Sequence, residues 1–307
     1  MQTNIDWDVQ INRYIQGLDR KPITKDSYKR MLTSFRNYLI DKKIIAPNKE
    51  DLIVYKEYLR EQVGSATVQK MMVVLRGFFV DLASNDIYPN IMLGIRGEKI
   101  TKDFKRSALT IEEVSKLLKK AGKLATTTEG KRNYAISALI ATTGLRTIEV
   151  ERANKADLSI KNDTHILFIQ GKGRDDKSQY AKISNEVYSI IEDYLFSRDD
   201  SEEALFVTHS RNTKTQRLPT WGIRSVIKEL LRSIGIDDPH YSAHSLRHSL
   251  ATNLIKQGMS INEAQLLLRH KDISTTMIYV HGIDREANNG ELLMSDLVLG
   301  GKTNGKH

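Results

Sequence analysis

The chain has 307 residues, 40% of them hydrophobic and 28% charged, a balance typical of a globular protein with room for two cores. It has no cysteine, which excludes disulfides, thiolate metal sites and a cysteine nucleophile. There is no run of eighteen apolar residues and the first ten residues do not resemble a signal peptide, so we expect a cytoplasmic protein without a membrane segment. The net charge of +9 favours an anionic partner, most commonly nucleic acid, but many soluble proteins are mildly basic and charge alone does not establish DNA binding.

The first 95 residues are predicted to form only helices. Apolar residues recur every three or four positions in segments 5–18, 24–43 and 65–84, and again around Leu52 to Leu59. Helices of this kind bury their apolar faces against each other, which predicts a bundle of four or five helices. Thr24 is the expected N-cap of the second helix, and Pro89 is expected to stop the fourth.

Basic residues occupy outward positions of this bundle. They are either an ordinary solvated face or, as a group, a surface that contacts DNA phosphates. The candidate DNA-binding residues here are Lys25, Lys29, Arg30, Arg36, Lys70 and Arg76. The charged, aperiodic stretch 96–107 follows and is predicted to be a basic linker between domains. Its candidate DNA-binding residues are Lys99, Lys102, Lys105 and Arg106.

Residues 108–300 are predicted to form a second, mixed α+β domain, with 301–307 as a disordered tail. Thr110 and Glu113 have the spacing of a capping box, which places a helix start there. The strands are expected between 156 and 184, as a hairpin whose turn is QGKGR. The other segments read as helices: 133–142 (ended by Gly144), 146–152, 220–233, 244–257, 261–269 and 275–280. The predicted fold class is mainly α with a small antiparallel β-hairpin sheet.

Six residues of this domain form a chemically coherent set. Two arginines, a lysine, two histidines and a tyrosine suit gripping a phosphodiester and attacking it with a phenol. In chain order they are Arg146 in GLRTIEV, Lys172 in QGKGR, His244 and Arg247 in HSLRHSLATNL, His270 in LLLRH, and Tyr279 in STTMIYVH. Glu149, one turn after Arg146, is placed to support it or simply to form a surface ion pair.

The two histidines of HSLRH also allow a metal site, since His244 and His248 are one helical turn apart and His270 follows. A zinc hydrolase of that spacing needs a glutamate after the first histidine, whereas Ser245 stands there. A metal-dependent nuclease is therefore the weaker hypothesis, and we expect no metal and no cofactor.

The segments GLRTIEV, HSLRHSLATNL and LLLRHKDISTTMIYVH resemble the tyrosine recombinases, also called phage-type integrases. Members typically carry an arginine in a GLR segment, a lysine on a β-hairpin, an H-x-L-R-H box, a downstream histidine or tryptophan, and a tyrosine nine residues later. The resemblance covers roughly residues 108–285, and the helical first domain is similar to the family's core-binding domain. One position departs: Arg269 stands where the family commonly has glycine, which would alter the loop before His270 or add a phosphate contact.

The resemblance implies that a DNA phosphodiester is attacked by Tyr279 while Arg146 and Arg247 clamp the phosphate. Only about one tyrosine in a thousand is ionised at neutral pH, so His244 and the arginines would have to assist. Lys172 would protonate the leaving 5′-oxygen, with the hairpin residues Lys177 and Lys182 as competitors. His270 would hydrogen-bond a phosphate oxygen.

The family also implies the partners: double-stranded DNA sites and a homotetramer assembled on them. Segment 288–299 is a candidate helix that packs either on a neighbouring protomer or on its own domain. The chain is of Xer-like length, and its role in mobile-element integration, inversion or dimer resolution stays open. A DNA-binding protein without catalysis is the alternative from a different class.

Overall fold

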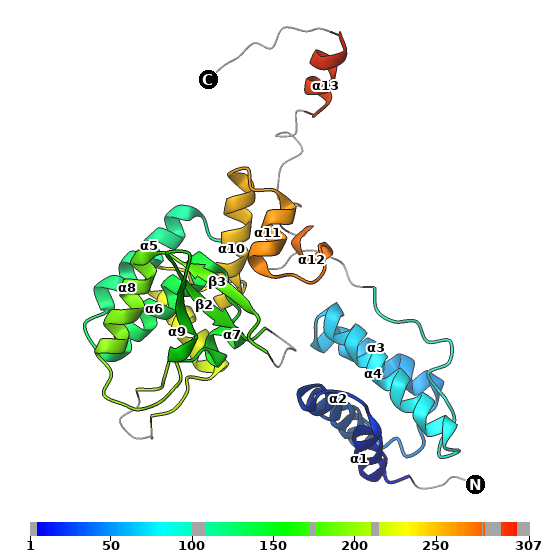
Figure 1. Cartoon of the computed structure of the whole chain (residues 1–307). Helices are drawn as coiled ribbons and strands as arrows, with labels where there is room; N and C mark the ends of the chain where they lie inside the picture. Colours follow the sequence, from blue (N-terminus) through cyan, green and yellow to red (C-terminus); the bar gives the residue numbers. More distant parts are fainter. Residues whose placement is uncertain are drawn as a thin grey trace. The chain divides into compact units, whose positions relative to one another are not determined.

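The computed structural model describes residues 5–99, 108–171, 176–209, 215–277, 279 and 290–299. The chain divides into two compact units, Met1–Asp103 and Phe104–His307, and each is described by itself (Figure 1). The division falls inside the stretch 96–107, which the sequence assigns to the linker.

The described part of the first unit is helical, as predicted. Its helices are α1 (Trp7–Gly17), α2 (Pro22–Asp41), α3 (Lys49–Gln62) and α4 (Ser65–Ser84). α4 contacts each of the other three through one broad apolar face, which includes Val68, Leu75 and Phe79. The core is rich in aromatic rings: Trp7 packs against Phe78 and Phe79, and Phe35 packs against Tyr55 and Phe79.

Two helix ends in this unit differ from the sequence-based expectation. The prediction of Thr24 as N-cap is wrong, because Pro22 opens α2 and Lys21 is its N-cap. Proline is favoured in the first turn, where its missing N–H breaks no hydrogen bond. α4 ends at Ser84, five residues before Pro89, and the chain turns away through Asp86 in a left-handed conformation. Proline is therefore not what stops this helix.

Residues 96–99, which the sequence assigns to the linker, are fastened to α3 and α4. The Glu98 carboxylate lies 2.8 Å from Arg60 and 3.3 Å from Lys56, and its backbone N–H donates to Gln69 at 2.6 Å. Lys56 also donates to the carbonyls of Arg96 and Gly97. These contacts extend the first unit beyond residue 95.

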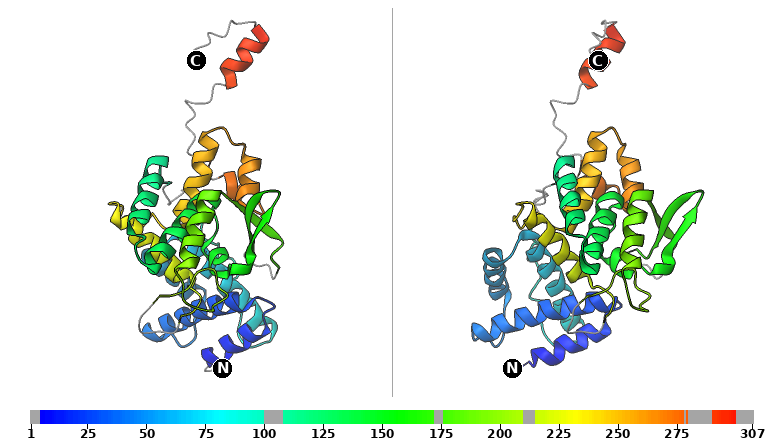
Figure 2. Two further views of the ribbon diagram at one scale, coloured as in Figure 1. Left: turned by 60° about the vertical axis from the view of Figure 1, so that its left-hand side comes forward. Right: turned by 90° about the vertical axis from the view of Figure 1, so that its left-hand side faces the viewer.

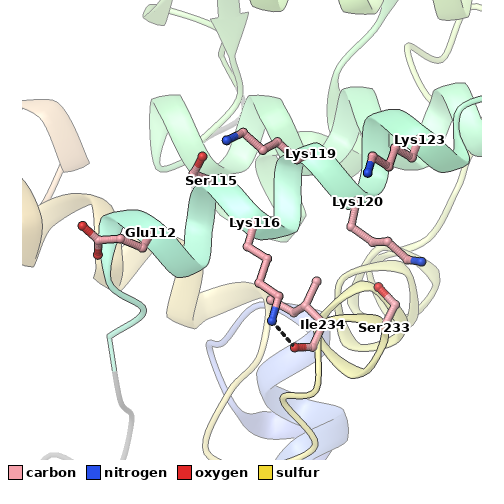
Figure 3. A pocket seen from close by; sticks show the side chains of 8 residues that line it. All are labelled: Glu112, Ser115, Lys116, Lys119, Lys120, Lys123, Ser233 and Ile234. Atoms are coloured by element: carbon pink, nitrogen blue, oxygen red, sulfur yellow. Dashed lines mark hydrogen bonds between the residues drawn. The ribbon is translucent and has the colours of Figure 1, made fainter.

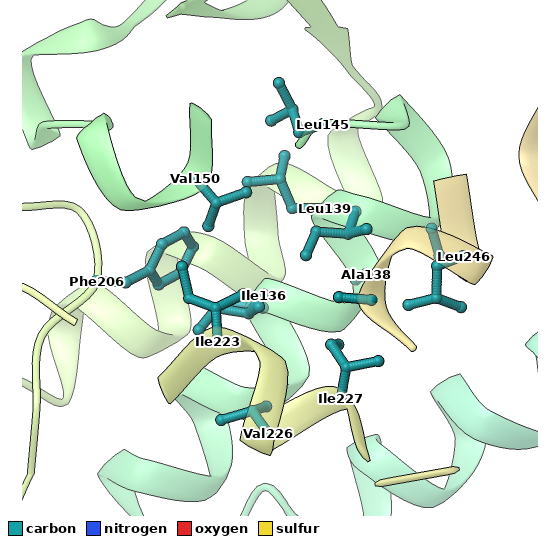
Figure 4. Close-up of a cluster of buried hydrophobic side chains, with 14 of the residues drawn as sticks. Ile136, Ala138, Leu139, Leu145, Val150, Phe206, Ile223, Val226, Ile227 and Leu246 are labelled. Carbon is teal, nitrogen blue, oxygen red and sulfur yellow. The ribbon is translucent and has the colours of Figure 1, made fainter. Parts of the chain in front are cut away.

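The second unit is built around α6. Its helices are α5 (Ile111–Leu124), α6 (Thr128–Thr143), α7 (Thr147–Arg152), the 3-10 turn η1 (Lys155–Asp157), α8 (Asn185–Phe196), α9 (Thr220–Ser233), α10 (Ala243–Lys256), α11 (Ile261–Leu268), α12 (Ser274–Met277) and α13 (Gly290–Leu299). α6 contacts α5, α8, α9, α10 and one strand, and nearly its whole circumference is buried. Figure 4 shows the apolar core that results, with Ile136 and Leu139 of α6 among side chains of α7, α9 and α10.

A three-stranded antiparallel sheet lies along one side of these helices (Figure 2). The strands are β1 (Leu158–Lys161), β2 (Thr164–Ile169) and β3 (Gln179–Ile183), in that spatial order. β2 and β3 are the predicted hairpin, with Leu167 opposite Ala181. β1 was not predicted as a separate strand. It joins β2 through Asn162 and Asp163, both with positive φ, a two-residue turn that suits the twist of a hairpin.

α8 was also absent from the sequence-based prediction, although its signals are present. Val187, Ile191 and Tyr194 form its buried face, and Ser184 caps its first turn. The mainly α fold with a small antiparallel sheet is otherwise as expected. Within the described ranges, no helix has the length and apolar character needed to cross a membrane.

Candidate active site

Arg146 is held at the junction between α6 and α7. α6 ends at Gly144 in a left-handed conformation, and a Cβ there would lie 3.0 Å from the side chains of Leu250 and Leu268, so glycine suits the position on both counts. Arg146 then caps α7. Its backbone N–H donates to Glu149 at 2.9 Å and its guanidinium to the other oxygen of the same carboxylate at 2.7 Å. Glu149 is only 2% exposed, so a buried carboxylate fixes both ends of Arg146.

Arg247 lies on α10 and is buried, with 1% of its surface exposed. Its two terminal nitrogens donate to the carbonyls of Gly144 and Leu268, at the ends of α6 and α11. Burial, followed by repulsion from Arg146, lowers the pKa of Arg247 to about 9. The guanidinium is therefore still protonated at neutral pH, and it is a buried cation whose charge is poorly compensated.

Tyr279 is 3% exposed and packs into a small apolar cluster formed by α10 and α11. The ring of His248 lies 4.9 Å away, centroid to centroid, and that of His270 lies 6.1 Å away and nearly parallel. Burial raises the pKa of the Tyr279 phenol, while Arg247 and Arg146 act in the opposite direction, Arg247 also through a hydrogen bond. The phenol is consequently protonated at neutral pH and lies beside the groups that can stabilise its anion.

His270 follows the end of α11, and its Nδ1 lies 2.9 Å from the Thr276 hydroxyl. Burial, and then repulsion from Arg247 and other nearby cations, lowers the pKa of His270 to about 4. The imidazole is therefore neutral at physiological pH. The hydrogen bond with Thr276 orients the ring and leaves its other nitrogen for a ligand.

His244 lies one turn before Arg247 and is exposed. Its charge contributes to the low pKa of His270, so the two imidazoles are within electrostatic reach of each other. The structure thus brings together five of the six predicted residues. The sixth, Lys172, lies outside the described residues.

The two competing lysines of the hairpin are placed differently. Lys177 forms an ion pair with Asp157 and donates to the carbonyl of Arg152 at 3.4 Å. Lys182 projects from β3 and is exposed. Lys177 therefore ties the segment before β3 to η1 and to the end of α7.

Three residues of the site were not assigned these positions from the sequence. Thr276 is fully buried and orients His270, and His248 was considered only as a metal ligand. Arg269 was expected near His270, but its partner, Glu149 at 3.4 Å, was not. The available signal was the STT triplet between His270 and Tyr279, whose hydroxyls are able to hydrogen-bond an imidazole.

The predicted DNA-binding residues of the first unit fall into two groups. Lys29, Arg30 and Lys70 are exposed, and Lys70 donates to Ser27, which places α4 beside α2. The half-buried residues have local partners: Lys25 donates to the Gln16 carbonyl, Arg36 pairs with Asp8 at 2.8 Å, and Arg76 donates to the Ile95 carbonyl. Lys99 is exposed, and Lys102, Lys105 and Arg106 lie outside the described residues.

A basic groove of about 490 Å³ lies between α5 and the end of α9 (Figure 3). Four lysines of α5 line it, and one of them, Lys116, donates to the Ile234 carbonyl at 3.2 Å. None of the predicted catalytic residues is among its lining residues, so it is separate from the site around Tyr279. Among the described residues, no group of three or more His, Cys, Asp or Glu is placed to hold a metal ion.

Residues 107–286 match the phage integrase family. The chain belongs to this family. It is a tyrosine recombinase, an enzyme that cuts and rejoins DNA in site-specific recombination. The mainly α fold and the resemblance seen in the sequence are thereby confirmed.

Relatives and solved structures agree with the assignment. The chain is 31% identical over 275 residues to tyrosine recombinase XerD of Oceanobacillus iheyensis, covering 84% of this chain and 87% of that protein. Its fold is similar to that of XerH recombinase bound to palindromic difH DNA after cleavage, with a TM-score of 0.70 at 18% identity, covering 98% of this chain and 92% of that one. Lambda integrase, solved as a tetramer on a Holliday junction, gives 0.67 at 17% identity and covers 89% and 78%.

Proposed function

We propose that Tyr279 is the nucleophile that cuts one DNA strand. Its phenolic oxygen bonds to phosphorus, the bond from phosphorus to the 5′-oxygen breaks, and a 3′-phosphotyrosyl link remains. The observation that carries this proposal is that the buried Tyr279 shares one site with Arg247, Arg146 and His270. A phenol held among cations is the arrangement that lowers the free energy of a developing phenolate.

Arg146 and Arg247 are proposed to bind the non-bridging oxygens of the scissile phosphate. These oxygens gain negative charge as the fifth bond to phosphorus forms, and guanidinium groups stabilise that charge with paired hydrogen bonds. Both arginines are held by protein partners before DNA arrives, Arg146 by Glu149 and Arg247 by two carbonyls. Such preorganisation lowers the reorganisation required in the transition state.

Two proton transfers complete the step. The exposed His244 is proposed to accept the phenolic proton, while the nearby arginines stabilise the phenolate that forms. The neutral His270 is proposed to donate a hydrogen bond to a phosphate oxygen. Lys172 is proposed to give a proton to the leaving 5′-oxygen. The reverse reaction uses the same groups, with a 5′-hydroxyl of another strand attacking the phosphotyrosyl link. Since that link preserves the phosphodiester's energy, the proposed reaction requires no cofactor.

The proposed partners are two double-stranded DNA sites and three further copies of the chain, which exchange strands through a Holliday junction. Lambda integrase has been solved as such a tetramer, which supports the proposal. In α13, Leu292, Met294 and Leu297 are exposed, which favours packing of segment 288–299 on a neighbouring protomer. The proposed place of action is the cytoplasm, where the enzyme would meet its DNA substrate.

A suicide substrate tests the nucleophile. A duplex selected from a random-sequence pool for binding to this protein is nicked near the cleavage point, so that the released fragment diffuses away and the covalent adduct accumulates. Tyr279→Phe is expected to form no adduct while binding the duplex as the wild type does. Tyr134→Phe, a partly buried tyrosine of α6, is the matched control and should form adduct normally. An adduct in Tyr279→Phe would refute the assignment.

A further inference from the structure

Arg269 is the C-cap of α11, and its backbone adopts a conformation that is unfavourable for residues other than glycine. Its φ is 55° and its ψ is 44°, the left-handed region in which glycine is the common residue. An arginine in this conformation carries backbone strain that glycine would avoid. Contacts of its side chain are therefore expected to offset this strain.

The side chain turns inward and contacts the site. It is 8% exposed, with one terminal nitrogen 3.4 Å from Glu149 and the other donating to the Leu267 carbonyl at 2.8 Å. The Glu149 oxygen that it approaches is the one that also accepts the backbone N–H of Arg146. One buried carboxylate thus joins the start of α7 to the end of α11, and it serves two arginines.

The charges around Glu149 do not balance. Among the described residues at this site, Arg146, Arg247 and Arg269 carry three positive charges, and Glu149 supplies the negative one. Arg269 contributes to the lowered pKa of both Arg247 and His270. Its charge is therefore felt throughout the site.

We propose that Arg269 is a positioning residue for strand cleavage, which shares Glu149 with Arg146 and keeps the site positive enough to bind the scissile phosphate. Without it, Glu149 is neutralised by Arg146 alone, and Arg146 has less charge to offer the substrate. The pairing also anchors the backbone immediately before His270. This inference rests on the proposed roles of Tyr279 and Arg146.

Lysine and methionine substitutions form the matched pair that tests the charge. Both put an unbranched side chain into the same left-handed conformation, so they share the backbone strain and differ in charge. In single-turnover cleavage of the nicked duplex described above, Arg269→Lys is expected within about threefold of wild type. Arg269→Met is expected to be slower by about tenfold to a hundredfold, as for other displaced active-site groups. Equal rates in the two variants would overturn the proposal, because the arginine would then act through its shape.

A second readout does not depend on activity. The pKa of His270, followed by NMR of the ring nitrogens in the DNA-free protein, is expected to rise towards its ordinary value in Arg269→Met and to stay low in Arg269→Lys. The sign follows because removing one nearby cation makes protonation easier, while Arg247, Arg146 and His244 remain. If the pKa of His270 were unchanged in Arg269→Met, the charge of Arg269 would not act on the site, and the proposal would be overturned.

Arg269→Gly separates folding from charge. Glycine relieves the left-handed strain, so this variant is expected to unfold at or above the wild-type temperature and still to cleave slowly. Tyr279→Phe identifies which proposal has failed. If it forms no adduct while Arg269→Met and Arg269→Gly cleave at the wild-type rate, only the role of Arg269 is refuted. If Tyr279→Phe forms adduct, the proposed function itself fails.

Discussion

The two units of this recombinase use positive charge in opposite ways. In the first unit, Lys29, Arg30 and Lys70 are exposed on α2 and α4, where water and salt screen them. In the second, Arg247 and Arg269 are buried around one carboxylate. Exposed cations contribute affinity that falls with ionic strength, whereas buried and positioned cations contribute to the rate of a chemical step. The first unit is therefore expected to set how tightly DNA binds, and the second how fast it is cut.

The largest expected effect is at the arginines of the second unit's site. Arg146→Ala should slow single-turnover cleavage by about a hundredfold to a thousandfold, as for the loss of one transition-state donor, while DNA affinity changes little. Glu149 keeps Arg269 as a partner, so the carboxylate is not left without a counter-charge. Arg224→Ala, an exposed arginine of α9, is the control. A loss of affinity equal to the loss of rate would erase the distinction between the units.

Lys172 would add a third kind of cation, one that moves a proton. Lys172→Ala should slow cleavage of a normal phosphodiester by about a hundredfold or more, the usual contribution of a general acid. A substrate with sulfur at the 5′-bridging position has a leaving group that scarcely requires protonation, so it should restore most of that rate. Arg146→Ala should gain no such rescue, because its defect is in stabilising the charge that develops on the non-bridging oxygens. Rescue of both variants, or of neither, would assign the acid to another residue.

The exposed cations of the first unit should affect DNA affinity and not the rate of cleavage. Replacing Lys29, Arg30 and Lys70 together by glutamine should lower DNA affinity by about tenfold or more at moderate salt. The slope of log affinity against log salt should fall by about two to three, since each lost phosphate contact contributes about 0.9. Cleavage at saturating DNA should be unchanged. An unaltered salt slope would show that this face of the bundle is only solvated.

The smallest effect concerns stability in acid. Because the pKa of His270 is held near 4, the unfolded chain takes up its proton first as the pH falls below about 6.5. His270 should therefore destabilise the fold progressively between pH 6.5 and 4. The free energy of unfolding, measured with urea, should fall between pH 7.5 and pH 5 by less in His270→Asn than in the wild type. The difference should be on the order of 1 kcal/mol, because the ring is half-exposed. Parallel curves would mean that the imidazole titrates normally.

The features predicted correctly from the sequence are those with a periodic pattern of apolar residues or a strict backbone requirement. The helical stripes of the first unit follow from spacing alone, and Gly144 marks the end of α6 because only a residue tolerant of positive φ fits there. The ordered set of Arg146, Arg247, His270 and Tyr279 is more specific than any one member, because two phosphate-binding arginines, a histidine and a nucleophilic tyrosine are rarely needed together. β1 escaped notice because it is four residues long and mostly exposed, which leaves no periodic signal. The inward turn of Arg269 depends on Glu149, 120 residues earlier, and no local pattern records such a pairing.

Three guanidinium groups around one carboxylate have a consequence for anyone who assays this enzyme. With no DNA bound, the excess charge attracts any small tetrahedral anion that can accept paired hydrogen bonds. Sulfate and phosphate buffers would then stabilise the second unit against unfolding and compete with the scissile phosphate. Chloride, which cannot accept such a fork, would act mainly through screening. The choice of buffer anion thus becomes a probe of the active site.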